Sequence, residues 1–175
     1  MFTIIFWVIV VAVAGLLITA AFRPDSFRIE RRIRIGAAPD TIFALIDDFR
    51  RWTAWSPWEN RDPALKRDYS GPASGRDSAY AWEGNSKVGK GRMQIVESTP
   101  YSRIRIQLDF LKPFEAHNTA EFALQPDGDS TDVVWAMYGP QPYLSKLMGL
   151  VVSMDTLVGK DFESGLANLK ARAES

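Results

Sequence analysis

The sequence has no cysteine and only one histidine, His117. Without thiols the chain can form neither a disulfide nor a thiolate metal site, and it has no cysteine nucleophile. A single imidazole argues against a histidine metal cluster and restricts a Ser-His triad to that residue. The 21 Lys and Arg residues are balanced by 21 Asp and Glu residues, so the basic excess of a nucleic-acid-binding protein is absent. We therefore expect no metal, no cofactor and no nucleic-acid partner.

Charge is also absent from all of residues 1–22, in which the only polar side chains are Thr3 and Thr19. The apolar run from Phe2 to Phe22 would form a helix of about 31 Å, close to the hydrocarbon thickness of a bilayer at about 30 Å. This run has no polar stripe, which a helix packed on a protein core needs for its solvent face. The pattern therefore predicts a transmembrane helix over residues 1–22.

A cleaved signal peptide is the remaining alternative for this segment. Such a peptide would carry a basic residue ahead of a shorter apolar run, and no Lys or Arg precedes this one. Thr19-Ala20-Ala21 is only a passable cleavage site. We therefore expect an uncleaved anchor, a linker over residues 23–26 and one soluble domain over residues 27–175.

Arginines set the expected orientation of this single-pass membrane protein. The positive-inside rule counts basic residues near the ends of a membrane helix, and here they all follow it. It therefore predicts a cytoplasmic carboxyl-terminal domain, although all but the first of these arginines fall in a predicted strand, which weakens the inference. The arginines are Arg23, Arg28, Arg31, Arg32 and Arg34.

The first part of the soluble domain predicts one strand and one helix. Residues 27–35 alternate apolar and charged side chains, the pattern of a half-buried strand. Ala38-Pro39-Asp40 then starts a helix whose apolar face runs from Ile42 to Phe49. A tryptophan-rich segment over residues 51–63 follows without a regular period.

The rest of the chain predicts a run of strands and then a helix. Alternating segments indicate five or six antiparallel strands, with a hairpin turn at Asp127-Gly128. Apolar residues at helical spacing over residues 147–169 predict one long amphipathic helix, kinked near Gly149 or Gly159. The segregation of strands from helices predicts an α+β fold, in which a curved antiparallel sheet wraps around the carboxyl-terminal helix.

This packing predicts a cavity. One helix is about 10 Å wide, whereas six strands at about 4.8 Å spacing make a sheet about 29 Å wide. The apolar face that the helix leaves uncovered must be closed by the first helix and the tryptophan-rich segment, or remain open as a pocket.

Four motifs in the soluble domain resemble those of a known family. The sequence resembles the polyketide cyclase/dehydrase-type members of the SRPBCC superfamily over residues 26–173. This resemblance implies the START-like helix-grip fold, a hydrophobic ligand cavity, and functions that range from lipid carriers to cyclases and co-chaperone-like domains. The motifs are Trp52-x-x-Trp55-Ser56-Pro57-Trp58-Glu59 with Asp62-Pro63, Trp82-Glu83-Gly84-Asn85 with Val88-Gly89-x-Gly91-x-Met93, Thr131-x-Val133-x-Trp135-x-Met137, and Gly159-Lys160-Asp161-Phe162-Glu163-x-Gly165-Leu166 with Leu169-Lys170.

The candidate ligand-binding residues are the side chains that would face the cavity if the apolar side of each strand points inward. The alternative interpretation is that they are ordinary core residues, with the tryptophans as a packed lid. The candidate set is Trp55, Trp58, Tyr80, Trp82, Met93, Ile106, Phe110, Asn118, Phe122, Trp135, Met137, Met154, Val158 and Phe162.

Polar residues on this face are few. The Tyr80 hydroxyl and Asn118 are the clearest inward polar groups, and they could orient a ligand, or satisfy each other or a buried water. His117 falls on the outward side of its strand, which favours a surface role. Gly84-x-x-x-x-Gly89-Lys90-Gly91 resembles a phosphate-binding loop but lacks its final Ser or Thr and precedes a strand, so a glycine-rich turn is the better interpretation.

These observations leave three hypotheses for function. The first is a membrane-anchored protein that binds a lipid-like or other hydrophobic small molecule, with no catalytic residue. The second, which depends on the resemblance alone, is a cyclase or dehydratase that would need a buried ionisable pair. The third is a co-chaperone-type module that binds a protein partner through the outer face of the sheet.

Overall fold

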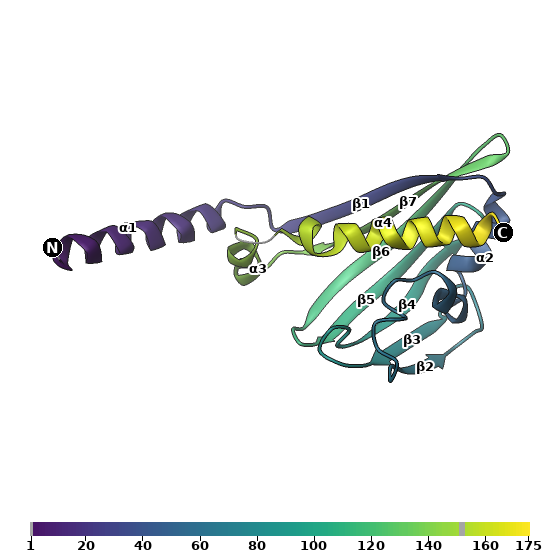
Figure 1. The fold of residues 1–175 in the computed structure, drawn as a ribbon, viewed down its shortest axis with the longest axis horizontal. Coiled ribbons are helices and arrows are strands. Elements are labelled where there is room, and N and C mark those ends of the chain that lie inside the picture. The colour runs from purple at the N-terminus through teal and green to yellow at the C-terminus, as the bar shows by residue number, and fades with distance from the viewer. Residues whose placement is uncertain (1, 151–152) are drawn as a thin grey trace.

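The computed structural model describes residues 2–150 and 153–175, which form one sheet, four α-helices and one 3₁₀ helix (Figure 1). The elements are α1 (Phe2–Ala21), β1 (Ser26–Ile35), α2 (Pro39–Ile46), η1 (Phe49–Ala54), β2 (Lys66–Ser70), β3 (Ala79–Glu83), β4 (Lys90–Thr99), β5 (Arg103–Lys112), β6 (Ala116–Asp127), β7 (Ser130–Pro140), α3 (Tyr143–Met148) and α4 (Met154–Ala173).

The sheet has seven antiparallel strands in the order β1-β7-β6-β5-β4-β3-β2. From β2 to β6, each strand pairs with the next along the chain, and β1 completes the order by pairing with β7. The sheet curves around α4, which runs beside β1 and β7 (Figure 1). This arrangement confirms the predicted α+β helix-grip fold. The short edge strand β2 was not predicted, because Lys66–Ser70 has no apolar alternation.

The carboxyl-terminal helix differs from the prediction. Apolar spacing predicted one helix from residue 147 to residue 169, but α3 ends at Met148 and α4 begins at Met154. The Ser153 hydroxyl caps α4 by accepting a hydrogen bond from the Thr156 amide. Gly159 lies within α4, which continues unbroken from Met154 to Ala173, and the Arg31 guanidinium packs against its bare Cα.

Aromatic rings fill the centre of the sheet under α4. Phe122 and Trp135 stack with their centroids 4.9 Å apart, and Phe162 of α4 stacks on Trp135 at 4.2 Å. Gly165 permits this close approach, since a Cβ there would lie 2.7 Å from the Trp135 ring. Trp52 packs edge-on against Phe122 from the side of η1. These rings connect the packing of α4 on the sheet with the packing of η1 on the sheet.

Helix α1 projects away from the domain beyond the first residue of β1 (Figure 1). Within the described residues it is the only helix long and apolar enough to cross a membrane, and its sole buried residue is Ala20. A helix of the domain core would instead be buried on at least one face.

The core rings give a direct test of the packing. Phe122 is fully buried, so Phe122→Ala should lower the free energy of unfolding by about 3–5 kcal/mol through lost burial and the cavity left behind. Phe114 is 71% exposed, and Phe114→Ala should change it by less than about 0.5 kcal/mol. Urea unfolding of the full chain in detergent micelles, followed by near-UV circular dichroism, measures both. Equal losses for the two variants would contradict this description of the core.

Candidate functional site

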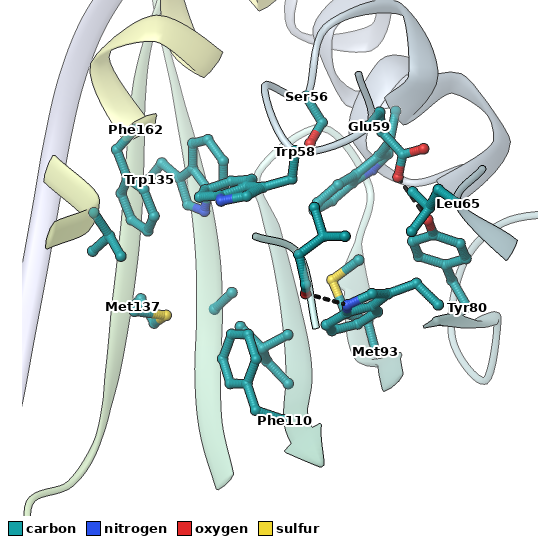
Figure 2. Close-up of a pocket in the computed structure, with 16 residues that line it drawn as sticks. Ser56, Trp58, Glu59, Leu65, Tyr80, Met93, Phe110, Trp135, Met137 and Phe162 are labelled. Carbon is teal, nitrogen blue, oxygen red and sulfur yellow. Dashed lines mark hydrogen bonds between the residues drawn. The ribbon is translucent and has the colours of Figure 1, made fainter. Parts of the chain in front are cut away.

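A cavity of about 180 Å³ lies between the inner face of β3–β7, the loop after η1 and the first half of α4 (Figure 2). Its wall is almost entirely apolar, with only Ser56, Glu59 and the Tyr80 hydroxyl among its polar groups apart from the indole N–H groups. The lining residues are Trp52, Ser56, Trp58, Glu59, Leu65, Tyr80, Trp82, Val88, Met93, Leu108, Phe110, Ala120, Trp135, Met137, Val158 and Phe162.

Most of the predicted site residues come together around this cavity. Those that line it are Trp58, Tyr80, Trp82, Met93, Phe110, Trp135, Met137, Val158 and Phe162. That they bind a ligand stays a prediction.

The other predicted site residues lie elsewhere in the fold. Trp55, Ile106 and Phe122 are fully packed core residues, and the Trp55 indole donates a hydrogen bond to the Leu45 carbonyl at 3.0 Å. Asn118 lies on the inner face of β6 but covers Gly139 rather than the cavity. Met154 packs against the core at the first turn of α4. A side chain that points inward does not necessarily border the cavity, because other core side chains fill the space over the centre of the sheet.

Several lining residues were not predicted. Ser56, Glu59 and Leu65 belong to the irregular segment after η1, where no periodicity shows which side chains face inward. Val88 lies in the β3–β4 turn. Ala120 could have been found from its alternation, because it shares the inward side of β6 with Phe122.

The cavity has a buried floor and an open side. Its floor is formed by side chains that are less than a tenth exposed, among them Tyr80, Met93 and Met137. Its partly exposed lining residues mark the mouth, which lies between α4 and the ends of β3, β4 and β5. The mouth residues are Trp58, Trp82, Val88, Phe110 and Val158.

A buried polar network forms one wall. The Tyr80 hydroxyl donates a hydrogen bond to Glu59 Oε1 at 2.8 Å, drawn dashed in Figure 2. The Arg67 guanidinium donates to Glu59 Oε2 at 2.6 Å and to the Glu59 carbonyl at 2.8 Å. Because Glu59 is only 5% exposed, Arg67 supplies the charge compensation that a buried carboxylate requires. Of the alternatives for Tyr80 and Asn118, mutual hydrogen bonding is wrong, since the Tyr80 hydroxyl donates to Glu59.

This network fixes the protonation of Tyr80. Burial raises the pKa of the Tyr80 phenol far above its ordinary value, and the hydrogen bond to Glu59 raises it further. The hydrogen bond from Arg67 to Glu59 likewise raises the pKa of the guanidinium. Tyr80 therefore stays a neutral donor. Glu59 and Tyr80 together form a buried ionisable pair of the kind that the enzyme hypothesis needs.

Trp135 has an unused polar group. Its indole Nε1 is the one buried side-chain nitrogen or oxygen that lacks a hydrogen-bond partner within the described part of the chain. The ring lines the cavity between Phe162 and Trp58 (Figure 2). Buried N–H groups are almost always paired, so this donor lacks a partner that it would normally have.

Two motifs weighed from the sequence do not form sites. The Gly84–Gly91 segment is a tight β3–β4 turn, in which the Gly84 amide donates to the Gly89 carbonyl at 2.9 Å. His117 is exposed on the outer face, 2.8 Å from Asp109, and this hydrogen bond raises its pKa. Among the described residues no group of His, Asp and Glu side chains is placed to hold a metal ion.

Comparisons with known proteins agree with this architecture. Residues 26–174 match the family model described as polyketide cyclase / dehydrase and lipid transport. No curated protein sequence matches the chain.

Solved structures resemble the fold at low sequence identity. The di-domain ARO/CYC StfQ of the steffimycin biosynthetic pathway has a TM-score of 0.65 at 14% identity, over 85% of this chain and 51% of that one. The Aha1 dimer from Colwellia psychrerythraea has a TM-score of 0.58 at 20% identity, over 85% and 96%. TTHA0849 from Thermus thermophilus has a TM-score of 0.59 at 19% identity, over 84% and 97%.

The pKa of Tyr80 predicts how stability depends on alkaline pH. The unfolded chain ionises Tyr80 near pH 10, whereas the folded chain holds its proton, so stability is lost as the pH rises above 10. This one group should cost about 1 kcal/mol between pH 10 and pH 11. Tyr80→Phe should remove that part of the loss, measured as urea unfolding of both proteins at pH 8, 10 and 11. If the free energy of unfolding fell by the same amount in wild type and Tyr80→Phe between pH 8 and pH 11, the raised pKa of Tyr80 would be refuted.

Proposed function

The chain belongs to the polyketide cyclase / dehydrase and lipid transport family, and we propose that it is a membrane-anchored protein that binds a hydrophobic small molecule such as a lipid. The observation that carries this proposal is an apolar cavity with an open side, situated where α4 leaves the sheet uncovered. Apolar lining with few polar groups is typical of small-molecule sites. Removing a ligand's apolar surface from water supplies about 25 cal/mol per Å² without any specific polar contact.

The volume of the cavity limits what it holds. An engineered apolar cavity of about 150 Å³ takes up benzene, and drug-sized pockets measure about 300–1,000 Å³. At about 180 Å³ this cavity suits one or two fused rings or a segment of an acyl chain. A longer molecule would leave its remainder outside the mouth, beyond Val88, Phe110 and Val158.

The polar groups of the wall favour a ligand with an acceptor atom. Tyr80 and Arg67 are already engaged by Glu59, whereas the Trp135 indole N–H has no partner within the described residues. An ether, ester or carbonyl oxygen of a ligand that reaches Nε1 would accept this hydrogen bond. The expected ligand is therefore an apolar molecule that carries a hydrogen-bond acceptor.

The anchor is the second part of the proposal. Tyr143 of α3 donates a hydrogen bond to the Leu17 carbonyl of α1 at 2.9 Å, and cleavage after Ala21 would remove this partner. We therefore favour a retained transmembrane helix over a signal peptide. The orientation with a cytoplasmic domain rests mainly on Arg23, because the arginines from Arg28 to Arg34 lie in β1, where they form ion pairs with the domain's own carboxylates.

The second candidate is a cyclase or dehydratase activity. It is favoured by the Glu59 carboxylate and the Tyr80 phenol, 2.8 Å apart in the cavity wall. As the structure stands, Arg67 neutralises the carboxylate and the phenol keeps its proton, so neither group is a free base. Binding is therefore the primary proposal.

Filling the cavity tests binding. Ala120 faces the cavity from β6, so Ala120→Phe should occupy the space and abolish ligand uptake. Ala123→Phe places the same ring on the outer side of the same strand and is the matched control. Native mass spectrometry of the full chain measures co-purified small molecules, and melting temperature with added 2-methoxynaphthalene measures uptake. A stabilising shift in wild type and Ala123→Phe but not in Ala120→Phe is expected; equal shifts in all three would contradict the proposal.

Trp135 gives a test of ligand class. Wild type should bind 2-methoxynaphthalene about fivefold more tightly than 2-ethylnaphthalene, because the ether oxygen gains a hydrogen bond worth about 1 kcal/mol. Trp135→Phe lacks the N–H and should reduce this ratio to about one, even though the enlarged cavity changes both affinities. An unchanged ratio in the variant would exclude Trp135 as the donor.

A further inference from the structure

The open side of the cavity lies at the end of the sheet from which α1 departs. Ser26, the first residue of β1, is paired with Pro140 at the end of β7. Further across the sheet, Tyr138 of β7 pairs with Thr119 near the start of β6, and Ala116 of β6 pairs with Phe110 near the end of β5. The β5–β6 hairpin, the β3–β4 turn and the start of β1 therefore share one end of the sheet, as Figure 1 shows for β1 and the hairpin.

The exposed apolar side chains of the domain gather at this same end. Of the eight large hydrophobic residues that are exposed among the described residues after residue 22, only Val96 and Tyr101 lie elsewhere. The others occupy the β5–β6 hairpin, α3 and the first turn of α4: Leu111, Phe114, Tyr143, Leu144, Met148 and Leu157. Soluble surfaces rarely concentrate such residues without a partner.

Two of these residues are chain neighbours of the mouth. Leu111 follows Phe110 in β5 and therefore lies on the outer face of the sheet, and Leu157 precedes Val158 in α4. Phe114, at the tip of the hairpin, is 71% exposed. Exposed apolar side chains thus lie on the outside of the domain at the same end as the mouth.

Helix α3 is fixed beside α1. Besides the Tyr143 bond to α1, Lys146 of α3 is only 6% exposed and its ammonium lies 2.5 Å from Asp25 in the connection to β1. Arg23 donates to the Gly149 carbonyl at 2.9 Å. These contacts hold the exposed Leu144 and Met148 next to the point where α1 would enter the bilayer.

From this arrangement, and resting on the proposed function, we propose that α3 and the β5–β6 hairpin form a second membrane contact that seats the mouth of the cavity on the bilayer. The occupant of this surface is the lipid leaflet that α1 enters. Apolar side chains at an interface bind lipid in proportion to the area that they bury. A ligand would then pass between leaflet and cavity without crossing water, and the part of a long ligand that the cavity cannot hold would remain among the lipids.

The absence of cysteine makes the contact directly measurable. Single variants Phe114→Cys, Leu144→Cys and, as control, Asp129→Cys carry one fluorophore each on the full chain in phosphatidylcholine–phosphatidylglycerol vesicles. Asp129 lies in the β6–β7 turn at the opposite end of the sheet and is also exposed. Lipids with a spin label near the headgroup should quench the labels at residues 114 and 144 and leave the label at residue 129 bright. Equal quenching at residues 114 and 129 would overturn the proposal.

A second measurement separates this inference from the binding proposal. The double variant Phe114→Ser/Leu144→Ser changes exposed residues only, so it should keep the melting-temperature shift with 2-methoxynaphthalene in detergent. Its transfer of 2-methoxynaphthalene from vesicles to the cavity, followed by fluorescence, should be about tenfold slower than in wild type. Unchanged transfer with intact binding would refute the membrane contact alone, whereas no shift in wild type would refute the binding proposal.

Discussion

The sheet is far wider than the one long helix that packs on it, and this mismatch governs how the domain is closed. Seven strands at about 4.8 Å spacing cannot be covered by a helix about 10 Å wide, so another part of the chain must close the apolar face. Helix α2 and the Trp-rich segment after it do so over the centre and one end, where Trp52, Trp55 and Phe122 pack together. At the other end the cover stops, and the cavity is the space that remains.

The cavity wall shows how a charged group is tolerated beside an apolar space. Glu59 is satisfied on both oxygens, by Tyr80 and by Arg67, so the wall gains rigidity without presenting a free charge to a ligand. The Trp135 N–H is the contrasting case, a buried donor without a partner within the described residues. The difference between these two polar features favours an uncharged ligand with an acceptor atom over an anionic one.

Helix α1, the mouth of the cavity and the exposed apolar residues share one end of the domain for a topological reason. Because β1 follows α1 directly and pairs with the last strand, the start of β1, the end of β7 and the β5–β6 hairpin must lie together. Helix α3 follows β7 and so returns to α1. The fold therefore brings the open side of the cavity to the end of the domain from which α1 departs, and the proposed membrane contact depends on this geometry.

Short-range periodicity was sufficient to predict much of this protein from its residues. The absence of charge over residues 1–22 predicted α1. Alternation of apolar and polar residues predicted the strands, the α+β order and the apolar inner face with Tyr80, Trp82, Met93 and Phe110. The roles of Glu59 and Ser56 were not predictable in this way, since an irregular loop has no period. The break between α3 and α4 escaped detection because the apolar spacing continues across it.

Tertiary packing settles which inward residues border the cavity and which are enclosed. Trp55 and Phe122 are enclosed, whereas Ala120 borders the cavity, although Phe122 and Ala120 share one face of β6. The difference depends on where η1, α4 and the sheet meet, and these segments are distant in sequence. A local pattern gives the direction of a side chain, but it carries no information about what covers that side chain.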